Sequence, residues 1–290
     1  MTQAPPPAHA HAFRGRVLVL AGSDSGGGAG IQADIKTITA LGGYAATAIT
    51  AITVQNTLGV TSVHPIPLDV VEAQARAVLD DIGADALKTG MLGDAATVEV
   101  VARVLDSAPK TQNGAAPAVI DPVMIAKGGA SLLAQEAVGA LKSLLIPRAA
   151  LLTPNAPEAA ALTGLSVETT DDLRRAGEAL LELGAHAVLM KGGHVANSER
   201  GGDRVIDLLI TRQGETAFEG ERIVTRHTHG TGCTLASACA TGLAQGMSLT
   251  ESVARAWNYV HEAMLRAPGF GAGHGPLDHA WPLRLDGGRQ

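Results

Sequence analysis

The sequence predicts an α/β fold built on a mostly parallel β-sheet. From Arg16 onward, short β-branched or Leu-rich runs alternate with longer amphipathic stretches, which is the pattern of repeated βα units. The 290 residues are 46% hydrophobic and 17% charged, enough apolar material for a large core, which excludes collagen, coiled coil and general disorder. Because α/β folds with one continuous sheet commonly reach this size, residues 15–290 are expected to form a single domain.

The elements follow one another in βα order. Six short, buried runs are predicted to be strands: Val17–Ala21, Ala46–Ile52, Ala86–Lys88, Ala118–Ile120, Ala150–Leu152 and Ala187–Met190. Five stretches with apolar spacing near 3.6 residues are predicted to be helices: Ile31–Leu41, Val70–Ile82, Ala95–Leu105, Leu132–Leu145 and Asp171–Leu183. The last third of the chain then predicts two antiparallel strands and two helices: Val205–Ile210, Glu219–Thr225, Gly230–Gln245 and Leu249–Arg266.

Several partner classes are excluded by composition. A net charge of −6 and 2% aromatic residues give no footprint for nucleic acid or an anionic membrane. Residues 1–14 lack a basic n-region and an apolar h-region, which predicts a disordered tail rather than a signal peptide. The uncharged stretch Thr37–Leu68 is broken by Gly42-Gly43 and prolines, so it predicts a buried strand with flanking turns rather than a membrane span. Two cysteines fit a reducing compartment, and a cytoplasmic location is expected.

Polar residues gather where predicted strands end. In open α/β sheets ligands bind in the crevice outside the carboxyl ends of the strands. The alternative, that Gly and Pro simply punctuate loops, leaves unexplained why Asp121, Asn155 and Lys191 share that edge. The segments concerned are Gly22–Gly30, Thr89–Met91, Asp121–Lys127, Pro154–Glu158 and Lys191–His194.

The glycine-rich segment Gly22–Gly30 either cradles a ligand or makes a structural turn. It follows a strand and opens a helix, so its amides could face an anion. Its spacing is not that of a G-x-G-x-x-G dinucleotide fingerprint. A Walker A motif is also missing, because Leu87 stands where the glycine before Lys88 is required.

The segment Gly230-Thr231-Gly232-Cys233 precedes an uncharged, small-residue helix, Leu235–Leu243. Consecutive amides at the positive end of a helix form an anion hole for a transferring phosphoryl group. The same position is expected to lower the pKa of Cys233 and to favour its thiolate. The alternative is a glycine-rich cap with an inert, buried cysteine, and this interpretation is preferred for Cys239 inside the helix.

Four residues suit phosphate and magnesium chemistry. Lys191 stands beside Gly192-Gly193 at a strand end, as a phosphate-neutralising lysine would, although a surface lysine fits equally. Asp121, Asn155 and Glu158 offer oxygen ligands for hydrated magnesium. Asn155 could instead be a helix N-cap, and Glu158 a first-turn acid that complements the helix dipole.

Taken together, these motifs resemble the hydroxymethylpyrimidine/phosphomethylpyrimidine kinase family of thiamine biosynthesis. The resemblance covers about residues 16–282 and implies a ribokinase-like fold, with a central, mostly parallel sheet flanked by helices on both faces. The motifs that carry it are AGSDSGGGAGIQAD (21–34), TAITVQNT (50–57), KTGML (88–92), DPVM (121–124), LTPNAPE (152–158), LMKGGH (189–194) and THGTGCT (228–234).

Carried over residue by residue, the resemblance assigns roles. It places four residues in the pyrimidine pocket: Gly22, Asp34, Gln55 and Met91. A carboxamide such as Gln55 complements an aminopyrimidine edge, as Gln and Asn complement adenine. The nucleotide and metal positions are Asp121, Asn155, Glu158, Lys191 and Arg255, with Asp121 and Glu158 holding Mg²⁺ through water. The anion hole and catalytic residues are Gly230, Thr231, Gly232, Cys233 and Lys191.

The implied reaction is ATP-dependent, magnesium-assisted phosphorylation of 4-amino-5-hydroxymethyl-2-methylpyrimidine, followed by phosphorylation of the monophosphate. The resemblance also suggests a homodimer. Two alternatives stay open: a pyridoxal or pyridoxine kinase of the same superfamily, and a non-catalytic nucleotide-binding sensor. The chain departs from the family at Ser25-Gly26, where Pro-Ser is more common and a more mobile loop is therefore expected, and at Arg255, where lysine is frequent.

Overall fold

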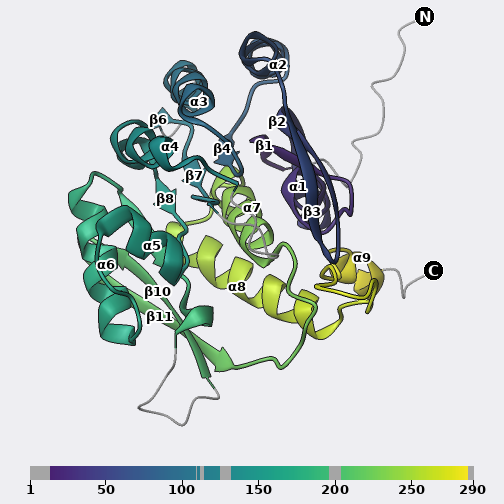
Figure 1. Ribbon diagram of the computed structural model, residues 1–290, viewed down its shortest axis with the longest axis vertical. Coiled ribbons are helices and arrows are strands. Elements are labelled where there is room, and N and C mark those ends of the chain that lie inside the picture. The colour runs from purple at the N-terminus through teal and green to yellow at the C-terminus, as the bar shows by residue number, and fades with distance from the viewer. Residues whose placement is uncertain (1–13, 109, 112–113, 125–131, 196–203, 287–290) are drawn as a thin grey trace, which may run out of the picture.

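The computed structural model describes residues 14–108, 110–111, 114–124, 132–195 and 204–286 (Figure 1). The predicted tail, apart from its last residue, and the end of the Asp121–Lys127 segment lie outside these residues. Arg14, where the description begins, is already attached to the fold, because its backbone N–H donates to the Gly42 carbonyl at 3.0 Å.

One nine-stranded sheet runs through the described chain in the order β11-β10-β9-β8-β7-β4-β1-β2-β3. Strands β2, β1, β4, β7, β8 and β9 pair in parallel, whereas β3, β10 and β11 pair antiparallel to their neighbours. The mostly parallel α/β fold is thereby confirmed. The strands are β1 Arg16–Asp24, β2 Tyr44–Asn56, β3 Gly59–Pro65, β4 Ala86–Thr89, β7 Ala118–Ile120, β8 Leu151–Leu152, β9 Ala187–Met190, β10 Arg204–Thr211 and β11 Gly214–Glu221, with a separate small hairpin of β5 Lys110–Thr111 and β6 Gly114–Ala115.

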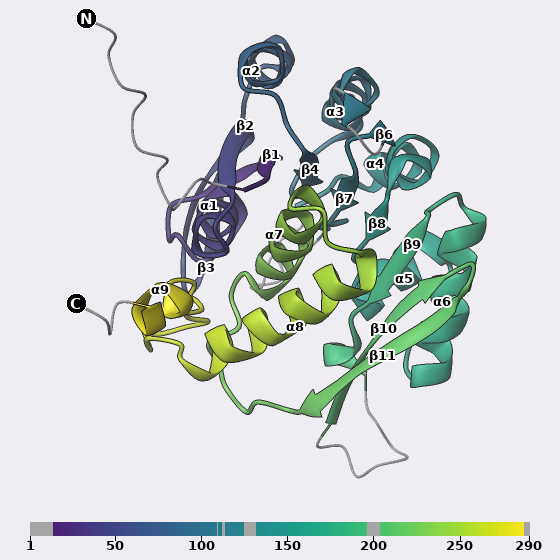
Figure 2. The same ribbon diagram turned by 180° about the vertical axis from the view of Figure 1, so that it is seen from behind.

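Helices cover both faces of the sheet (Figures 1 and 2). Alternation along β1 divides the core: Val17 and Val19 pack on the face of α1, α7 and α8, while Leu18 and Leu20 pack on the opposite face. Both faces of the central strands are therefore buried, as parallel sheets require. The helices are α1 Gly30–Ala40, α2 Leu68–Asp81, α3 Ala95–Ser107, α4 Gln135–Ala140, α5 Ala156–Thr163, α6 Thr170–Glu182, α7 Thr231–Ala244, α8 Leu249–Leu265 and α9 Trp281–Asp286.

Edge elements differ most from the sequence predictions. The stretch predicted as one buried strand contains the β2–β3 hairpin, and β3 escaped prediction because its polar, exposed residues end in Pro65. Strand β11 begins five residues before the predicted Glu219, because its first half is exposed and polar. The predicted helix Leu132–Leu145 starts at Gln135 and continues beyond α4 as a π-helical turn. Over the described residues, no helix combines the length and apolar character needed to cross a bilayer.

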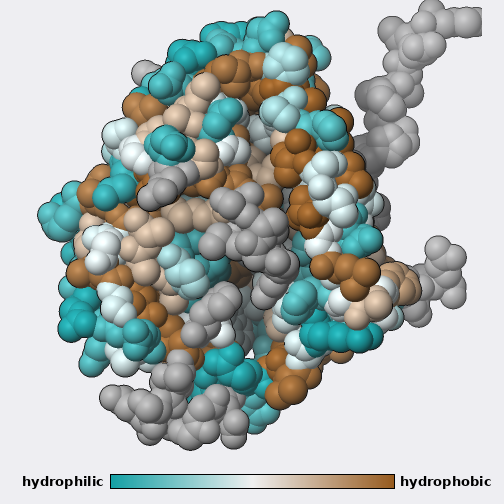
Figure 3. Space-filling model, viewed as in Figure 1, coloured by the Kyte–Doolittle hydropathy of each residue, from teal (hydrophilic) through white to brown (hydrophobic). Residues whose placement is uncertain are grey.

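Apolar side chains are exposed on the sheet edge that carries β2 and β3. Ile52 and Val54 alternate along β2, and they are 47% and 49% exposed. Tyr44 and Val63 add to the exposed apolar surface of the same two strands. Figure 3 shows hydrophobic residues gathered on this side of the molecule. Isolated exposed hydrophobic residues are ordinary, but a group on an edge hairpin is typical of a surface that another chain covers.

Candidate active site

The carboxyl ends of the parallel strands meet the N-terminus of α7 at one edge of the sheet. Backbone hydrogen bonds tie the strand-end segments together: Gly90 N–H donates to Leu20, Asp121 N–H to Thr89, and Lys191 N–H to the Pro154 carbonyl, each at 3.0 to 3.1 Å. Helix α7 contacts β1, β4 and β7 beneath this edge. The segments that the sequence singled out therefore lie side by side.

Lys191 lies between two carboxylates and the first turn of α7. Its Nζ is 3.2 Å from Asp121 Oδ1 and 3.8 Å from Glu158 Oε2. A Cβ built on Gly232 would lie 3.3 Å from the same Nζ and 3.6 Å from Asp121 Oδ2. The ammonium group is therefore directly beside the predicted anion hole. The surface-lysine alternative does not fit, because the Lys191 side chain is only 14% exposed.

The start of α7 has a backbone that only glycine adopts comfortably. Gly230 has φ +85°, and a Cβ on it would lie 1.8 Å from the Gly28 carbonyl oxygen. Helix α7 begins at Thr231, so the amides of Gly232 and Cys233 belong to its first turn and have no acceptor within the helix. Small residues thus bring free N–H groups and the positive end of the helix dipole to the Lys191 ammonium.

The expectation of a low pKa for Cys233 is wrong for the protein without ligands. Burial raises the pKa of Cys233 to about 11; Lys88 opposes the rise, and Asp34 and Asp121 add to it. The thiol also accepts a hydrogen bond from the Gly30 N–H. Loss of water and two nearby carboxylates outweigh the helix terminus, so Cys233 is a neutral thiol at pH 7. Cys239 is fully buried, and burial raises its pKa to about 12, in keeping with the inert role expected for it.

Asp34 lies in the interior of the protein, and the substrate contact that the resemblance implies for it stays a prediction. Its carboxylate is completely buried and accepts from Lys88 Nζ at 2.9 and 3.1 Å and from Ser237 Oγ at 2.7 Å. Burial alone would lower the pKa of Lys88, but the Asp34 carboxylate raises it above its ordinary value. Asp34 and Lys88 therefore form a buried ion pair. Sequence reasoning missed this role of Lys88, although a lysine at the end of a fully buried strand is itself a signal.

Gly22 and Met91, both predicted to line the pyrimidine pocket, lie next to each other. A Cβ on Gly22 would lie 2.4 Å from the Met91 methyl carbon, so the absence of a side chain at Gly22 makes room for the thioether. Thr50 Oγ1 donates to the Met91 carbonyl at 2.7 Å and fixes that strand end.

Gln55 has its amide held in one orientation. Thr53 Oγ1 donates to the Ser23 carbonyl at 2.8 Å, so it accepts from Gln55 Nε2 at 2.7 Å. The oxygen of the Gln55 side-chain amide, Oε1, is therefore the acceptor that this orientation presents. Ser25 Oγ donates to the Gln55 carbonyl of the main chain at 2.7 Å and accepts from the Gln55 N–H at 3.0 Å. Ser25, the residue that departs from the family pattern, thus ties the loop to β2, whereas a more mobile loop was expected.

Asn155 and Glu158 use part of their capacity in a capping box at the start of α5. Asn155 Oδ1 accepts from Glu158 N–H at 2.9 Å, and Glu158 Oε2 accepts from Asn155 N–H at 2.8 Å. The N-cap alternative therefore describes Asn155 correctly. Burial raises the pKa of Glu158 to about 7, Lys191 opposes the rise, and the nearby Asp121 carboxylate adds to it.

Arg255 is not brought to this edge. Its Nη1 donates to Gln245 Oε1 at 2.6 Å, at the C-terminal end of α7 and thus at the opposite end from the anion hole. Trp257 of α8 instead contacts the segment that follows Lys191, through Asp207. Its side chain donates to Asp207, and Asp207 accepts from the Gly192 N–H at 2.7 Å.

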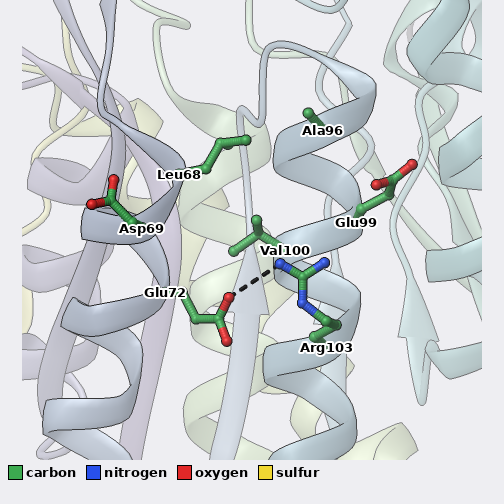
Figure 4. Close-up of a pocket in the computed structure, with 7 residues that line it drawn as sticks. All are labelled: Leu68, Asp69, Glu72, Ala96, Glu99, Val100 and Arg103. Carbon is green, nitrogen blue, oxygen red and sulfur yellow. Dashed lines mark hydrogen bonds and ion pairs between the residues drawn. The ribbon is translucent and has the colours of Figure 1, made fainter.

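A separate groove of about 270 Å³ lies between α2 and α3 (Figure 4). The pair formed by Arg103 Nη2 and Glu72 Oε2, 3.1 Å apart, crosses it. None of the residues at the carboxyl edge lines this groove, so it is not the site described above.

Solved structures define the class of protein. The pyridoxal kinase of Bacillus subtilis in its ADP complex superposes with a TM-score of 0.82 at 34% identity, over 94% of this chain and 99% of that one. A phosphomethylpyrimidine kinase from Clostridium difficile gives a TM-score of 0.73 at 40% identity, over 86% and 98% of the two chains. The mostly parallel sheet and this likeness define an ATP-using kinase of the ribokinase-like class.

Sequence comparison then gives the family. The sequence model of the protein family described as phosphomethylpyrimidine kinase matches residues 24–278 of this chain. The hydroxymethylpyrimidine/phosphomethylpyrimidine kinase of Bacillus subtilis is 47% identical over 264 residues, which cover 91% of this chain and 94% of that protein. The enzyme of the same description from Streptomyces coelicolor is 48% identical over 267 residues, 92% and 95% of the two chains. The chain belongs to the phosphomethylpyrimidine kinase family, and it is a phosphotransferase.

Proposed function

We propose that this kinase transfers the γ-phosphoryl group of ATP to the hydroxymethyl group of 4-amino-5-hydroxymethyl-2-methylpyrimidine, and then phosphorylates the resulting monophosphate. The observation that supports this site most strongly is the Lys191 ammonium beside Gly232 at the α7 N-terminus. The comparisons favour the kinase over a nucleotide-binding sensor without turnover, because the matched relatives are described as kinases.

Charge stabilisation and positioning carry the proposed mechanism. Phosphoryl transfer passes through a loose transition state, so the protein supplies mainly donors and alignment. The amides of Gly232 and Cys233 and the Lys191 ammonium would stabilise the equatorial oxygens of the transferring group. Cys233 would take the proton of the substrate hydroxyl. Because its resting thiol is neutral, only the thiolate fraction of Cys233 could accept this proton.

The residues at the edge fit a magnesium ion. Asp121 and Glu158 are buried carboxylates near one another, and the Asp121 carboxylate contributes to the raised pKa of Glu158. A second cation beside Lys191 would therefore stabilise this pair electrostatically. Magnesium is typically held by one or two carboxylates, substrate phosphates and waters. Asp121 and Glu158 would hold the ion, which neutralises phosphate charge when bound. No cluster of three or more His, Cys, Asp or Glu side chains that could hold a metal ion occurs in the described part of the chain.

Gln55 would recognise the aminopyrimidine edge through its oriented carbonyl oxygen. Gln55→Leu should lower kcat/KM for the pyrimidine, because it leaves buried ligand groups unpaired. The expected loss of transition-state stabilisation is about 1–3 kcal/mol. The KM for ATP should change far less. Steady-state ADP-release kinetics test this, with Gln213→Leu in the exposed β10–β11 turn as the control. Unaltered pyrimidine kinetics in Gln55→Leu would remove the residue from the pocket.

Pyridoxal or pyridoxine is a second candidate acceptor, because the pyridoxal kinase from Bacillus subtilis superposes with the higher TM-score of the two structures compared. A coupled ADP-release assay with both alcohols separates the candidates. We expect the larger kcat/KM for the pyrimidine, since sequence identity is higher to the pyrimidine kinases. A larger value for pyridoxine would reverse the assignment.

The exposed apolar edge supports a homodimer. Ile52 and Val54 on β2 would be covered by the same surface of a second chain, as in the closed two-fold symmetry common to soluble oligomers. Light scattering should give twice the chain mass of 29.5 kDa. Val54→Asp should shift the protein toward the monomer, since it would bury a carboxylate in the interface. A wild-type protein with the mass of one chain at micromolar concentration contradicts the dimer.

A further inference from the structure

His229 joins three segments that surround the proposed acceptor position. Its ring Nε2 is 2.9 Å from Asp24 Oδ2 in the glycine-rich loop. Its backbone N–H donates to the Gly275 carbonyl at 3.1 Å. The preceding residue of that C-terminal segment is tied to the β2–β3 turn, where His274 N–H donates to the Thr57 carbonyl at 2.8 Å. The residue immediately before the anion hole is thus attached to two other loops.

Asp24 organises the glycine-rich loop around its carboxylate. The side chain is 1% exposed, Oδ1 accepts from Gly26 N–H at 2.7 Å, and Oδ2 accepts from Gly28 and Ala29 N–H at 2.9 and 2.7 Å. Burial would raise the pKa of Asp24, but His229 and these amides hold it below its ordinary value. The carboxylate is therefore ionised, with the imidazole N–H as its one side-chain donor among the contacts described here.

The two loops also touch backbone to backbone. A Cβ on Gly28 would lie 2.5 Å from the His229 ring, and a Cβ on Gly230 would lie 1.8 Å from the Gly28 carbonyl oxygen. No side chain fits between them. A shift of either loop would therefore have to break the Asp24–His229 contact or separate this packing.

We propose that His229 is a positioning residue, which uses Asp24 to hold the glycine-rich loop in register with the anion hole. The proposal rests on the proposed function, in which the acceptor alcohol lies on that loop and the phosphoryl group lies on the α7 amides. In-line transfer requires the hydroxyl oxygen and the phosphorus within about 3–3.5 Å, and a displacement of 1 Å can cost about 10²-fold in rate. His229 itself touches neither reacting atom.

The test compares His229→Leu with His229→Gln and measures product formed per ATP consumed. His229→Leu removes the donor to Asp24 and should lower kcat for the pyrimidine by about 10- to 10²-fold. Because the acceptor is then misaligned while the phosphates stay bound, water should take a larger share of the phosphoryl groups, and product per ATP should fall. His229→Gln keeps an N–H donor and should recover much of both values. ATP Kd should stay within about threefold of wild type in each variant.

The matched control is His186→Leu, at an exposed histidine just before β9, which should leave all of these values unchanged. A His229→Leu protein that loses rate and thermal stability together, with wild-type product per ATP and no recovery in His229→Gln, would make His229 merely structural. If wild type prefers pyridoxine, the acceptor assignment fails, but the same ratio measured with pyridoxine still decides the role of His229.

Discussion

Replacing Lys191 with alanine is expected to lower kcat by about 10²–10³-fold, the cost typical of removing one preorganised donor from a developing oxyanion. The Lys191 ammonium lies beside Gly232 and within 3.2 Å of Asp121, so it acts where the transferring group would gather charge. Pyrimidine affinity should change far less, because in the proposed site the ring binds on the side of Gly22 and Met91. Arginine should rescue poorly, since a planar fork does not reproduce a compact point charge.

The Lys191→Ala variant also leaves two buried carboxylates without their cation, which by itself destabilises the fold. Lys191→Ala combined with Glu158→Gln removes much of this repulsion and is the matched control for stability. Thermal unfolding should improve in the double variant while kcat stays low. Turnover within threefold of wild type in Lys191→Ala would show that the lysine only balances Asp121 and Glu158.

Replacing Cys233 with serine is expected to lower kcat by about 10²-fold, at the lower end of general-base effects, with pyrimidine binding nearly intact. The substitution keeps the Gly230–Cys233 backbone and a hydroxyl but removes the ionisable thiol. Cys233→Asp should recover part of the activity, because it restores a proton acceptor. Cys239→Ser is the control, since that thiol is buried within α7.

The pH profile gives an independent check on Cys233. Burial raises the pKa of the thiol to about 11, so the thiolate fraction grows about tenfold per pH unit below that value. If the thiolate takes the proton, wild-type kcat should climb from neutral into alkaline pH, and Cys233→Ser should lose this rise. Iodoacetamide should label Cys233 with the same dependence on pH. Near-full rate in Cys233→Ser with an unaltered profile would assign the chemistry to the amides alone.

The central sheet could be predicted from sequence because its strands are buried on both faces and carry continuous apolar runs. Ala187–Met190 was predicted with the correct bounds for this reason. The edge strands β3 and β11 are largely exposed, so their sequences lack the apolar run that predicts a buried strand. Periodicity located most helices, but not the π-helical turn after α4, which depends on tertiary packing.

The candidate site was predictable to the extent that chain topology determines it. Lys191, Asp121 and Gly232 each follow from a strand end or a helix start, so their meeting follows from the parallel sheet. Contacts between distant side chains do not follow in this way. Lys88 donates a hydrogen bond to Asp34, 54 residues away in the sequence, and His229 contacts Asp24, 205 residues away. The raised pKa of Cys233 could not be predicted for the same reason, because its burial and the surrounding carboxylates come from other elements.

A crystal structure with the hydroxymethylpyrimidine and a non-hydrolysable ATP analogue tests the central claim most directly, namely that the phosphoryl group is transferred between the glycine-rich loop and the α7 N-terminus. The account predicts γ-phosphate oxygens within hydrogen-bond distance of the Gly232 and Cys233 amides and of Lys191 Nζ. It also predicts the pyrimidine between Gln55 and Met91, with its hydroxymethyl group turned toward the γ-phosphorus. A γ-phosphate bound away from α7, or a pyrimidine bound elsewhere than against the glycine-rich loop, would contradict it.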